Sequence, residues 1–219
     1  TIRVCNSLSC ELFGSKELES NLAKNYKGQD VRVLKAPCMG RCSYAPVLEI
    51  GHYHIENASL EKVDQAIKNN WIKPDIPNYE TFENYIEKGG YKQLSEIRSG
   101  KENWYENIVK ADLRGLGGAG FRTAKKWELV SKETSPRYLA VNGDEGEPGT
   151  FKDKHYLETE PHMFLEGVLM ASIAVSAEKC FIYIRDEYPA ILHILRKEIT
   201  KLEQKKIVPI GFFDLRRGA

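Results

Sequence analysis

The stretch "RYLAVNGDEGEPGTFKD", residues 137–153, sets a short apolar strand directly before a loop that is both acidic and rich in glycine. Ligands of α/β folds bind at the carboxyl ends of strands, so we expect a binding site here. A solvated acidic turn is the alternative. Because three carboxylates and an amide stand among three glycines, we favour a loop that accepts hydrogen bonds from ribose, ribityl or carboxamide groups. The side chains concerned are Asn142, Asp144, Glu145 and Glu147.

Upstream, residues 112–127 read "DLRGLGGAGFRTAKKW" and form a second candidate loop. We expect one helix to end near Lys110 and another to begin after the glycines. Consecutive backbone N–H groups ahead of a helix N-terminus form a concavity that binds anions, and Lys125 or Lys126 would add a positive charge. The loop lacks the Walker pattern, and no strand precedes it as in a Rossmann fold. A glycine-rich surface turn beside solvated lysines is the alternative.

Four of the five cysteines lie in the first 42 residues as two close pairs, Cys5 with Cys10 and Cys38 with Cys42. Two such pairs predict one four-thiolate metal site, with two ligands supplied by each of two loops. Structural zinc usually takes tighter pairs, whereas the larger core of a [2Fe–2S] cluster accommodates wider ones, so the spacing favours iron–sulfur and leaves zinc and disulfides open. Cys180 leads into an apolar strand and is interpreted as a small buried hydrophobe.

The residues around these cysteines predict a small α/β domain over 1–72. Strands are expected at "IRVC" and "VRVLKAPC", with a helix at "GSKELESNLAKNY" between them. A hairpin turning at Gly51 and a helix capped by Ser59, with Val63 and Ile67 inward, would complete the domain. Residues 73–110 are expected to form a linker and short helices, whose inner faces would carry Tyr85, Ile86, Leu94, Ile97, Trp104, Ile108 and Val109.

Composition indicates an ordinary globular protein, with no nucleic-acid partner and no direct insertion into a membrane. Of the 219 residues, 42% are hydrophobic and 29% charged, and the net charge is +1. This balance gives no reason to expect nucleic acid or an anionic surface as a partner. No apolar run approaches the roughly 20 residues that a membrane span requires, and no signal-peptide core opens the chain, so we expect a cytoplasmic protein. The histidines show no ligand spacing, and His52 and His54 are expected to serve packing or the surface.

The amino-acid sequences of the two cysteine loops make the prediction for residues 1–70 more specific. "CNSLSC" with "APCMGRCSYAP" resembles the thioredoxin-like [2Fe–2S] ferredoxin domains of NADH dehydrogenases and related diaphorases. This resemblance implies that Cys5, Cys10, Cys38 and Cys42 hold one [2Fe–2S] cluster. The 27-residue spacer between the pairs is somewhat short for that family.

Residues 78–219 carry a second resemblance. "LRGLGGAGFRTAKKW" followed by "NGDEGEPGTFKD" is similar to the FMN- and NADH-binding half of the respiratory complex I flavoprotein subunit, which NAD-linked hydrogenases and NAD-dependent formate dehydrogenases share. The resemblance implies an α/β FMN-binding domain over 111–219, with Phe121 against the nucleotide. It places Glu145 and Glu147, the implied catalytic residues, beside the nicotinamide. The implied flavin contacts are Gly115, Gly117, Gly118, Lys126, Asn142, Asp144 and Glu145.

The chain departs from that family at several positions. Leu116 stands where arginine is usual, Arg122 where proline is usual, and Glu128 and Leu129 where an aromatic residue is common. The family continues into a second flavin-contacting segment and a four-cysteine [4Fe–4S] domain. We therefore interpret the end of the sequence, "KIVPIGFFDLRRGA", as a strand in a truncated FMN domain.

These features predict a module that passes electrons between NAD(H), FMN and iron–sulfur clusters, alongside other iron–sulfur and catalytic subunits. Carriage of both domains in one chain favours the beta subunit of a soluble NAD-dependent formate dehydrogenase, with the diaphorase subunit of an NAD-linked hydrogenase or a complex I flavoprotein as alternatives. A hypothesis from another class is a zinc-stapled, non-catalytic nucleotide-binding scaffold. Visible absorption by flavin and iron–sulfur would separate the two classes.

Overall fold

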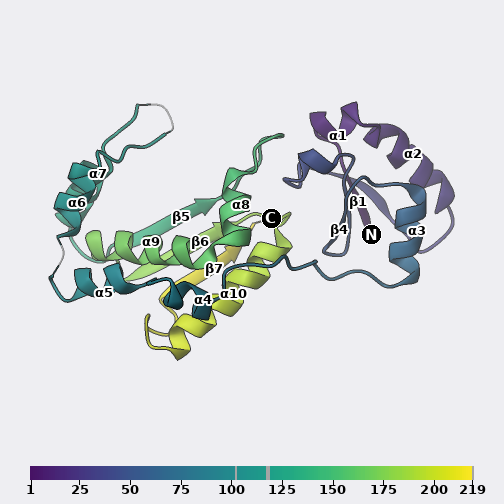
Figure 1. Cartoon of the computed structure of the whole chain (residues 1–219). Helices are drawn as coiled ribbons and strands as arrows, with labels where there is room; N and C mark the ends of the chain where they lie inside the picture. The colour runs from purple at the N-terminus through teal and green to yellow at the C-terminus, as the bar shows by residue number, and fades with distance from the viewer. Residues whose placement is uncertain (102, 117–118, 219) are drawn as a thin grey trace.

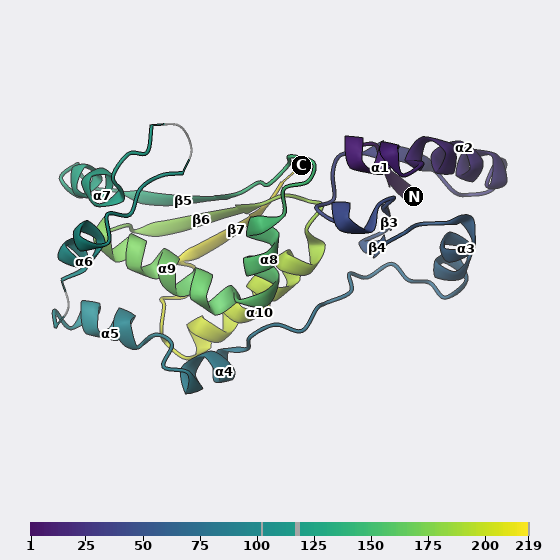
Figure 2. The same cartoon turned by 45° about the horizontal axis from the view of Figure 1, so that its top comes forward.

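The computed structural model describes residues 1–101, 103–116 and 119–218. Two sheets with separate hydrophobic cores lie at opposite ends of the molecule (Figures 1 and 2). The carboxyl ends of the strands in the second sheet point toward the first. The interface between the two parts therefore collects the cysteine loops and the acidic loop.

The N-terminal part is built on a four-stranded mixed sheet of order β2-β1-β3-β4. β1 pairs in parallel with β2 and antiparallel with β3, and β3 forms a hairpin with β4. The strands are β1 (Ile2–Cys5), β2 (Val33–Ala36), β3 (Leu48–Ile50) and β4 (Tyr53–Ile55). Its helices are α1 (Leu8–Leu12), α2 (Ser15–Asn25), the 3₁₀ turn η1 (Cys42–Tyr44) and α3 (Leu60–Lys68).

Helix α3 shows how far local pattern decides packing. The Ser59 hydroxyl accepts a hydrogen bond from the Lys62 N–H at 3.3 Å, which confirms the expected N-cap. Val63 is fully buried as expected, but Ile67 is 39% exposed and Ala66 is buried in its place. The prediction for Ile67 was wrong because the helix ends one residue later and its last turn leaves the sheet.

The C-terminal part is built on a three-stranded parallel sheet of order β5-β6-β7. Helices α8 and α9 connect β5 to β6, and α10 connects β6 to β7, as parallel pairing requires. Of the expected strand at the chain end, only β7 forms, because residues 206–211 make a turn. The elements are β5 (Tyr138–Gly143), α8 (Lys152–Thr159), α9 (Pro161–Ala174), β6 (Lys179–Ile184), α10 (Pro189–Gln204) and β7 (Phe213–Arg217).

The segment between the two sheets is more ordered than a linker. Its helices are α4 (Phe82–Glu87), α5 (Lys92–Arg98), α6 (Trp104–Lys110) and α7 (Thr123–Ser131). Phe82, Tyr91 and Leu94 belong to the core of the C-terminal part. The buried Glu166 carboxylate on α9 accepts hydrogen bonds from the Tyr91 N–H at 3.0 Å and the Leu94 N–H at 3.3 Å. Two residues expected on inner faces, Ile86 and Val109, are 42% and 48% exposed: α4 buries Phe82 instead, and no residue of α6, all of which the structure describes, is fully buried.

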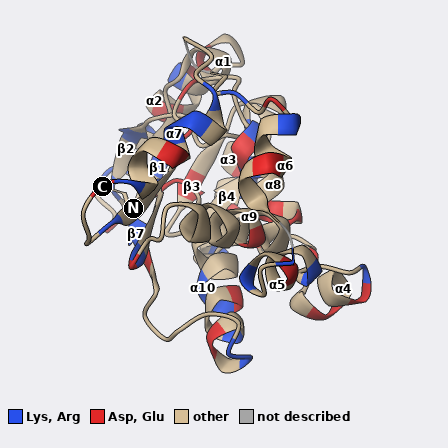
Figure 3. Ribbon diagram, turned by 90° about the vertical axis from the view of Figure 1, so that its left-hand side faces the viewer, with Lys and Arg blue, Asp and Glu red and all other residues tan. Residues whose placement is uncertain are grey.

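The surface carries charges of both signs. Lysine, arginine, aspartate and glutamate positions intermix along α4 and α10 (Figure 3), in keeping with a net charge of +1. No helix in the described ranges has both the length and the apolar character needed to cross a membrane.

Candidate functional site

The four N-terminal cysteines come together at one end of the first sheet. β1 ends at Cys5, α1 carries Cys10, and the loop after β2 carries Cys38 and Cys42. The Sγ atoms of Cys38 and Cys42 are 3.4 Å apart. Hydrogen bonds from the Cys10 and Cys38 thiols hold the pKa of the Cys5 thiol far below its ordinary value. Cys5 therefore contacts both its own pair partner, Cys10, and Cys38 of the second pair.

The donor set fits a four-thiolate cluster. All four cysteines are free thiols, and three of them are buried. Within the described ranges, no group of three or more His, Cys, Asp or Glu side chains is arranged around a single metal ion. A structural zinc needs four donors around one centre, whereas each iron of a [2Fe–2S] cluster takes two thiolates. Four free thiols gathered at one end of the sheet are the donor set that a [2Fe–2S] cluster takes.

The cysteine loop touches the acidic loop of the other sheet. The Gly149 N–H donates to Cys42 Sγ at 3.2 Å. Gly40 lies so close to Tyr188 that a Cβ on it would be 2.5 Å from the Tyr188 hydroxyl. These contacts join the two candidate sites that the sequence predicted separately.

Glu145 in the acidic loop is a buried helix cap. Its two carboxylate oxygens accept hydrogen bonds from the backbone N–H groups of Asp153 and Lys154, at 2.9 and 3.0 Å, at the start of α8. Burial opposes ionisation, but these N–H groups lower the pKa of Glu145 below its ordinary value. The Tyr188 hydroxyl also donates to this carboxylate, at 3.3 Å. The geometry thus gives Glu145 the task of shaping the loop, while Glu147 and Asp144 are exposed.

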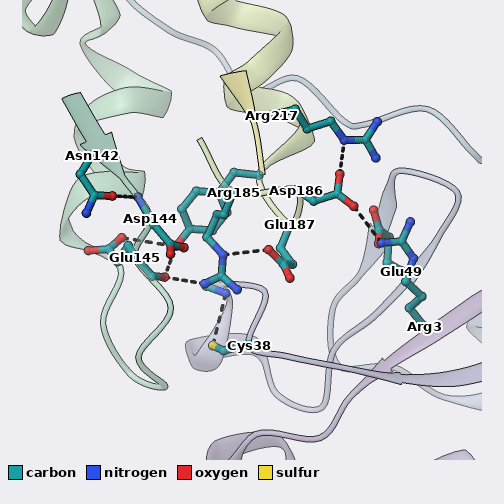
Figure 4. A network of polar contacts seen from close by, with 12 residues as sticks. Arg3, Cys38, Glu49, Asn142, Asp144, Glu145, Arg185, Asp186, Glu187 and Arg217 are labelled. Atoms are coloured by element: carbon teal, nitrogen blue, oxygen red, sulfur yellow. Dashed lines mark hydrogen bonds and ion pairs between the residues drawn. The ribbon is translucent and has the colours of Figure 1, made fainter. Parts of the chain in front are cut away.

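Arg185 and its neighbours hold the acidic loop from the other side. The buried Arg185 guanidinium donates to the Glu145 carbonyl oxygen and, through Nε, to the Glu187 carboxylate at 2.9 Å. Asp186 makes ion pairs with Arg3 of the N-terminal part, at 3.1 Å, and with Arg217 at the end of β7. Figure 4 shows these side chains converging where the two parts meet.

A cavity beside β5 suits a flat aromatic ligand. It has a volume of about 630 Å³ and lies between β5, α7, α8 and α9. Asn142 and Gly143 line its end near the acidic loop, and Trp127, Tyr156 and Phe164 form apolar walls. Cofactor sites have this size and this mixture of apolar walls with a few polar groups.

The glycine loop forms a hairpin that projects away from the acidic loop (Figures 1 and 2). The Gly115 N–H bonds the Phe121 carbonyl at 3.0 Å, and Asp112 pairs with both Arg114 and Arg122. Helix α7 follows with no side chain capping its N-terminus in the described part of the chain, and Lys126 and Phe121 are exposed there. Lys125 is instead paired with Glu128, at 3.1 Å. Gly117 and Gly118 lie outside the described residues.

Comparison with known families decides what these two parts are. Residues 1–70 match the thioredoxin-like [2Fe-2S] ferredoxin family, and residues 108–216 match the Nuo51 FMN-binding domain family. The chain joins one domain of each family. The expected α/β fold, the [2Fe–2S] cluster and FMN are thereby confirmed as the properties of these domain families.

Relatives of known description match part of this chain. An NADH-quinone oxidoreductase subunit of Aquifex aeolicus is 42% identical over 130 residues, which are 59% of this chain and 30% of the relative. The subunit of the same name from Rickettsia bellii is 52% identical over 93 residues, or 42% of this chain and 22% of the relative. The chain thus spans about a third or less of the length of these relatives.

A solved structure matches both domains at once. An NAD⁺-reducing [NiFe]-hydrogenase in its air-oxidised state aligns with 100% of this chain and 42% of its own, with a TM-score of 0.79 and 25% identity. Its alignment therefore includes the thioredoxin-like domain, the connecting helices and the FMN-binding domain in one polypeptide.

The structure also reveals residues to which sequence reasoning gave no role. Trp127 lines the β5 cavity, and Arg185 and Tyr188 bridge the two domains. His162 is fully buried between Tyr91 and Glu198, with ring nitrogens 2.9 Å from each partner. The only signal in the sequence was position: Arg185 and Tyr188 directly follow a strand in a parallel sheet, where ligand-binding loops gather.

Proposed function

We propose that the chain is the electron-input part of an NADH-oxidising enzyme, in which the FMN-binding domain delivers electrons to the thioredoxin-like [2Fe–2S] domain. The contact between the cysteine loop and the acidic loop carries the proposal. A hydrogen bond of 3.2 Å from Gly149 to Cys42 brings a cluster ligand against the loop that follows β5. FMN, when bound, accepts a hydride from NADH and releases the electrons singly.

The described residues divide the work of binding between two places. The N-terminus of α7, which no described side chain caps, suits the FMN phosphate together with exposed Lys126, because a helix N-terminus and a lysine both attract anions. Asn142 lines the cavity that would take the ring system, and exposed Asp144 would accept hydrogen bonds from ribityl hydroxyls. Gly115, Gly117 and Gly118 would allow close approach of the ligand, with Phe121 stacking on the nucleotide.

The catalytic assignment rests on exposure. Glu147 is exposed and free to face the nicotinamide, whereas the Glu145 carboxylate is buried against α8. We therefore assign Glu147 to nicotinamide binding, and Glu145 to holding the acidic loop in the shape that presents Asp144 and Glu147.

The first experiment is anaerobic reconstitution of the chain with iron, sulfide and FMN. We expect two iron atoms per chain, visible absorption from both cofactors, and bleaching of the flavin band on addition of NADH. Zinc in place of iron, with no flavin retained, would instead favour the nucleotide-binding scaffold.

Five free cysteines suit a cytoplasmic location, where thiols stay reduced.

The identity of the electron partner is the finer part of the proposal. The sequence favours a formate dehydrogenase, while the alignment of one hydrogenase chain with 100% of this chain supports a hydrogenase diaphorase as the second candidate. The test is NAD⁺ reduction by the complex purified from its natural source, with formate and hydrogen supplied in turn. Activity with formate alone supports the first candidate, and activity with hydrogen alone supports the second.

A further inference from the structure

Arg185 is a buried cation fixed at the boundary between the two domains. Its residue exposure is 5%, and three groups of its own domain hold it in place. Nη1 donates to the Glu145 carbonyl oxygen, Nε donates to Glu187 at 2.9 Å, and the guanidinium carbon lies 5.2 Å from the centre of the Tyr188 ring. Arginine keeps its charge under all physiological conditions, so this is a permanent positive charge.

The fixed guanidinium faces the cysteine loop of the other domain. Figure 4 shows its free edge directed at Cys38, with Glu187 on the opposite side. Figure 4 draws a polar contact between this guanidinium and the Cys38 sulfur. The same loop lies against Tyr188 at Gly40 and accepts the Gly149 hydrogen bond at Cys42.

A cation beside the [2Fe–2S] cluster affects the reduction potential of the cluster more than its assembly. One-electron reduction makes a [2Fe–2S] cluster with its four thiolates one unit more negative. A buried positive charge and N–H donors beside the sulfur atoms stabilise that added charge, which raises the reduction potential. Low exposure strengthens the effect, because little solvent screens the charge.

We propose that Arg185 of the FMN-binding domain sets the reduction potential of the cluster held by Cys5, Cys10, Cys38 and Cys42. The inference rests on the proposed function, because it requires the cluster to be present. If so, the reduction potential of the cluster depends on the contact between the two domains. Separation of the domains would lower it without any change in the four ligands.

The test is an EPR-monitored redox titration of the reconstituted chain. Arg185→Met keeps the length of the side chain and removes its charge. At the midpoint potential of the unsubstituted protein, we expect the ratio of reduced to oxidised cluster to fall about tenfold, which is a shift of about 59 mV for a one-electron couple. Arg185→Lys should restore most of the difference. Arg217→Gln is the matched control, since it removes an equal charge from an exposed arginine at the same boundary and should shift the ratio less than twofold.

A second variant separates tuning from mere loss of structure. Glu187→Gln removes the carboxylate that partly neutralises Arg185, so the potential should rise, opposite in sign to Arg185→Met. Shifts of the same sign in both variants, or no shift in either while the cluster signal persists, would overturn the inference and leave the proposed function standing. Absence of any cluster signal in the unsubstituted chain would overturn both.

Discussion

The cysteine site and the flavin site of this protein are assembled in different ways. The four cysteines lie within 42 residues, and one small sheet brings their loops to one end. The candidate flavin groups come from a hairpin before α7, a loop after β5 and a cavity walled by three helices. The first site lies within one domain, whereas the second is distributed over several separate elements of the C-terminal part.

This difference predicts that one site tolerates less change than the other. In the proposed cluster each thiolate is a ligand with a single task. In the acidic loop we expect the tasks to be shared, so that a buried residue shapes the loop and exposed ones meet the ligand. Substitutions at the two sites should therefore differ in kind, and the following predictions test that contrast from the largest effect to the smallest.

Replacement of a cluster ligand should have the largest effect. Cys42→Ser should abolish [2Fe–2S] assembly, because a four-thiolate cluster loses one of its ligands. Iron and sulfide analysis after reconstitution measures it. Cys180→Ser is the control: this thiol is fully buried in the other core, burial raises its pKa to about 12, and iron content should be unchanged. Equal iron in both variants would contradict the assignment of Cys42.

A side chain added at Gly40 should weaken the contact between the two domains, because Tyr188 occupies the space beside it. Gly40 has φ +64° and lies against the buried Tyr188, so Gly40→Ala adds backbone strain and a steric clash that together cost about 2–4 kcal/mol. Gly28→Ala shares the positive φ, at +82°, but meets nothing within 4 Å. Calorimetric unfolding of the two variants should show the lower Tm for Gly40→Ala. Equal melting temperatures would mean that the contact with Tyr188 contributes nothing.

The two glutamates of the acidic loop should separate stability from activity. Glu145→Gln should cost about 1–2 kcal/mol of unfolding free energy, because the start of α8 loses a charged acceptor. Since the pKa of Glu145 is lowered, its stabilisation is present above the ordinary value and disappears as pH falls through the lowered one. Glu147→Gln should leave stability unchanged and slow NADH oxidation more than it weakens FMN retention. Loss of flavin with normal turnover in the loaded fraction would contradict the placement of Glu147.

The smallest expected effect is a pH dependence in the thioredoxin-like domain. Burial raises the pKa of Glu49 to about 7, against the attraction of Arg3. A raised carboxyl pKa favours folding while the group is protonated, so this contribution shrinks as pH rises from about 4.5 through 7. Between pH 5.5 and 8 we expect a loss on the order of 1 kcal/mol that Glu49→Gln removes. Identical slopes in denaturant titrations of both proteins would contradict this.

The sequence predicted what depends on local pattern. Strand ends, the Ser59 cap and the cysteine pairs are recorded in a few neighbouring residues, and the structure has them where expected. The family resemblance supplied the cofactors, which the family matches confirm. Roles of individual site residues in the glycine and acidic loops remain predictions.

What depends on packing between distant segments was not predictable from pattern. Arg185 and Tyr188 look like the ordinary polar end of a strand, and only the docking of the two domains brings Tyr188 against Gly40 and Arg185 toward Cys38. His162 likewise has no partner nearby in sequence, although it is fully buried beside Tyr91 and Glu198. Contact between residues that lie far apart in the sequence leaves no periodic signal in one sequence.

The short connection between the domains has a consequence for their association. On the N-terminal side, the Ile72 carbonyl oxygen accepts a hydrogen bond from the His52 N–H. On the C-terminal side, the Tyr79 hydroxyl donates to the Glu198 carboxylate, and the Glu80 N–H donates to the Thr159 carbonyl oxygen. Only residues 73–78 run free, which can span about 20 Å when fully extended. A tether of this length keeps the domains at millimolar effective concentration toward each other. At that concentration a few contacts, such as the pair between Arg3 and Asp186, suffice to keep the two domains together.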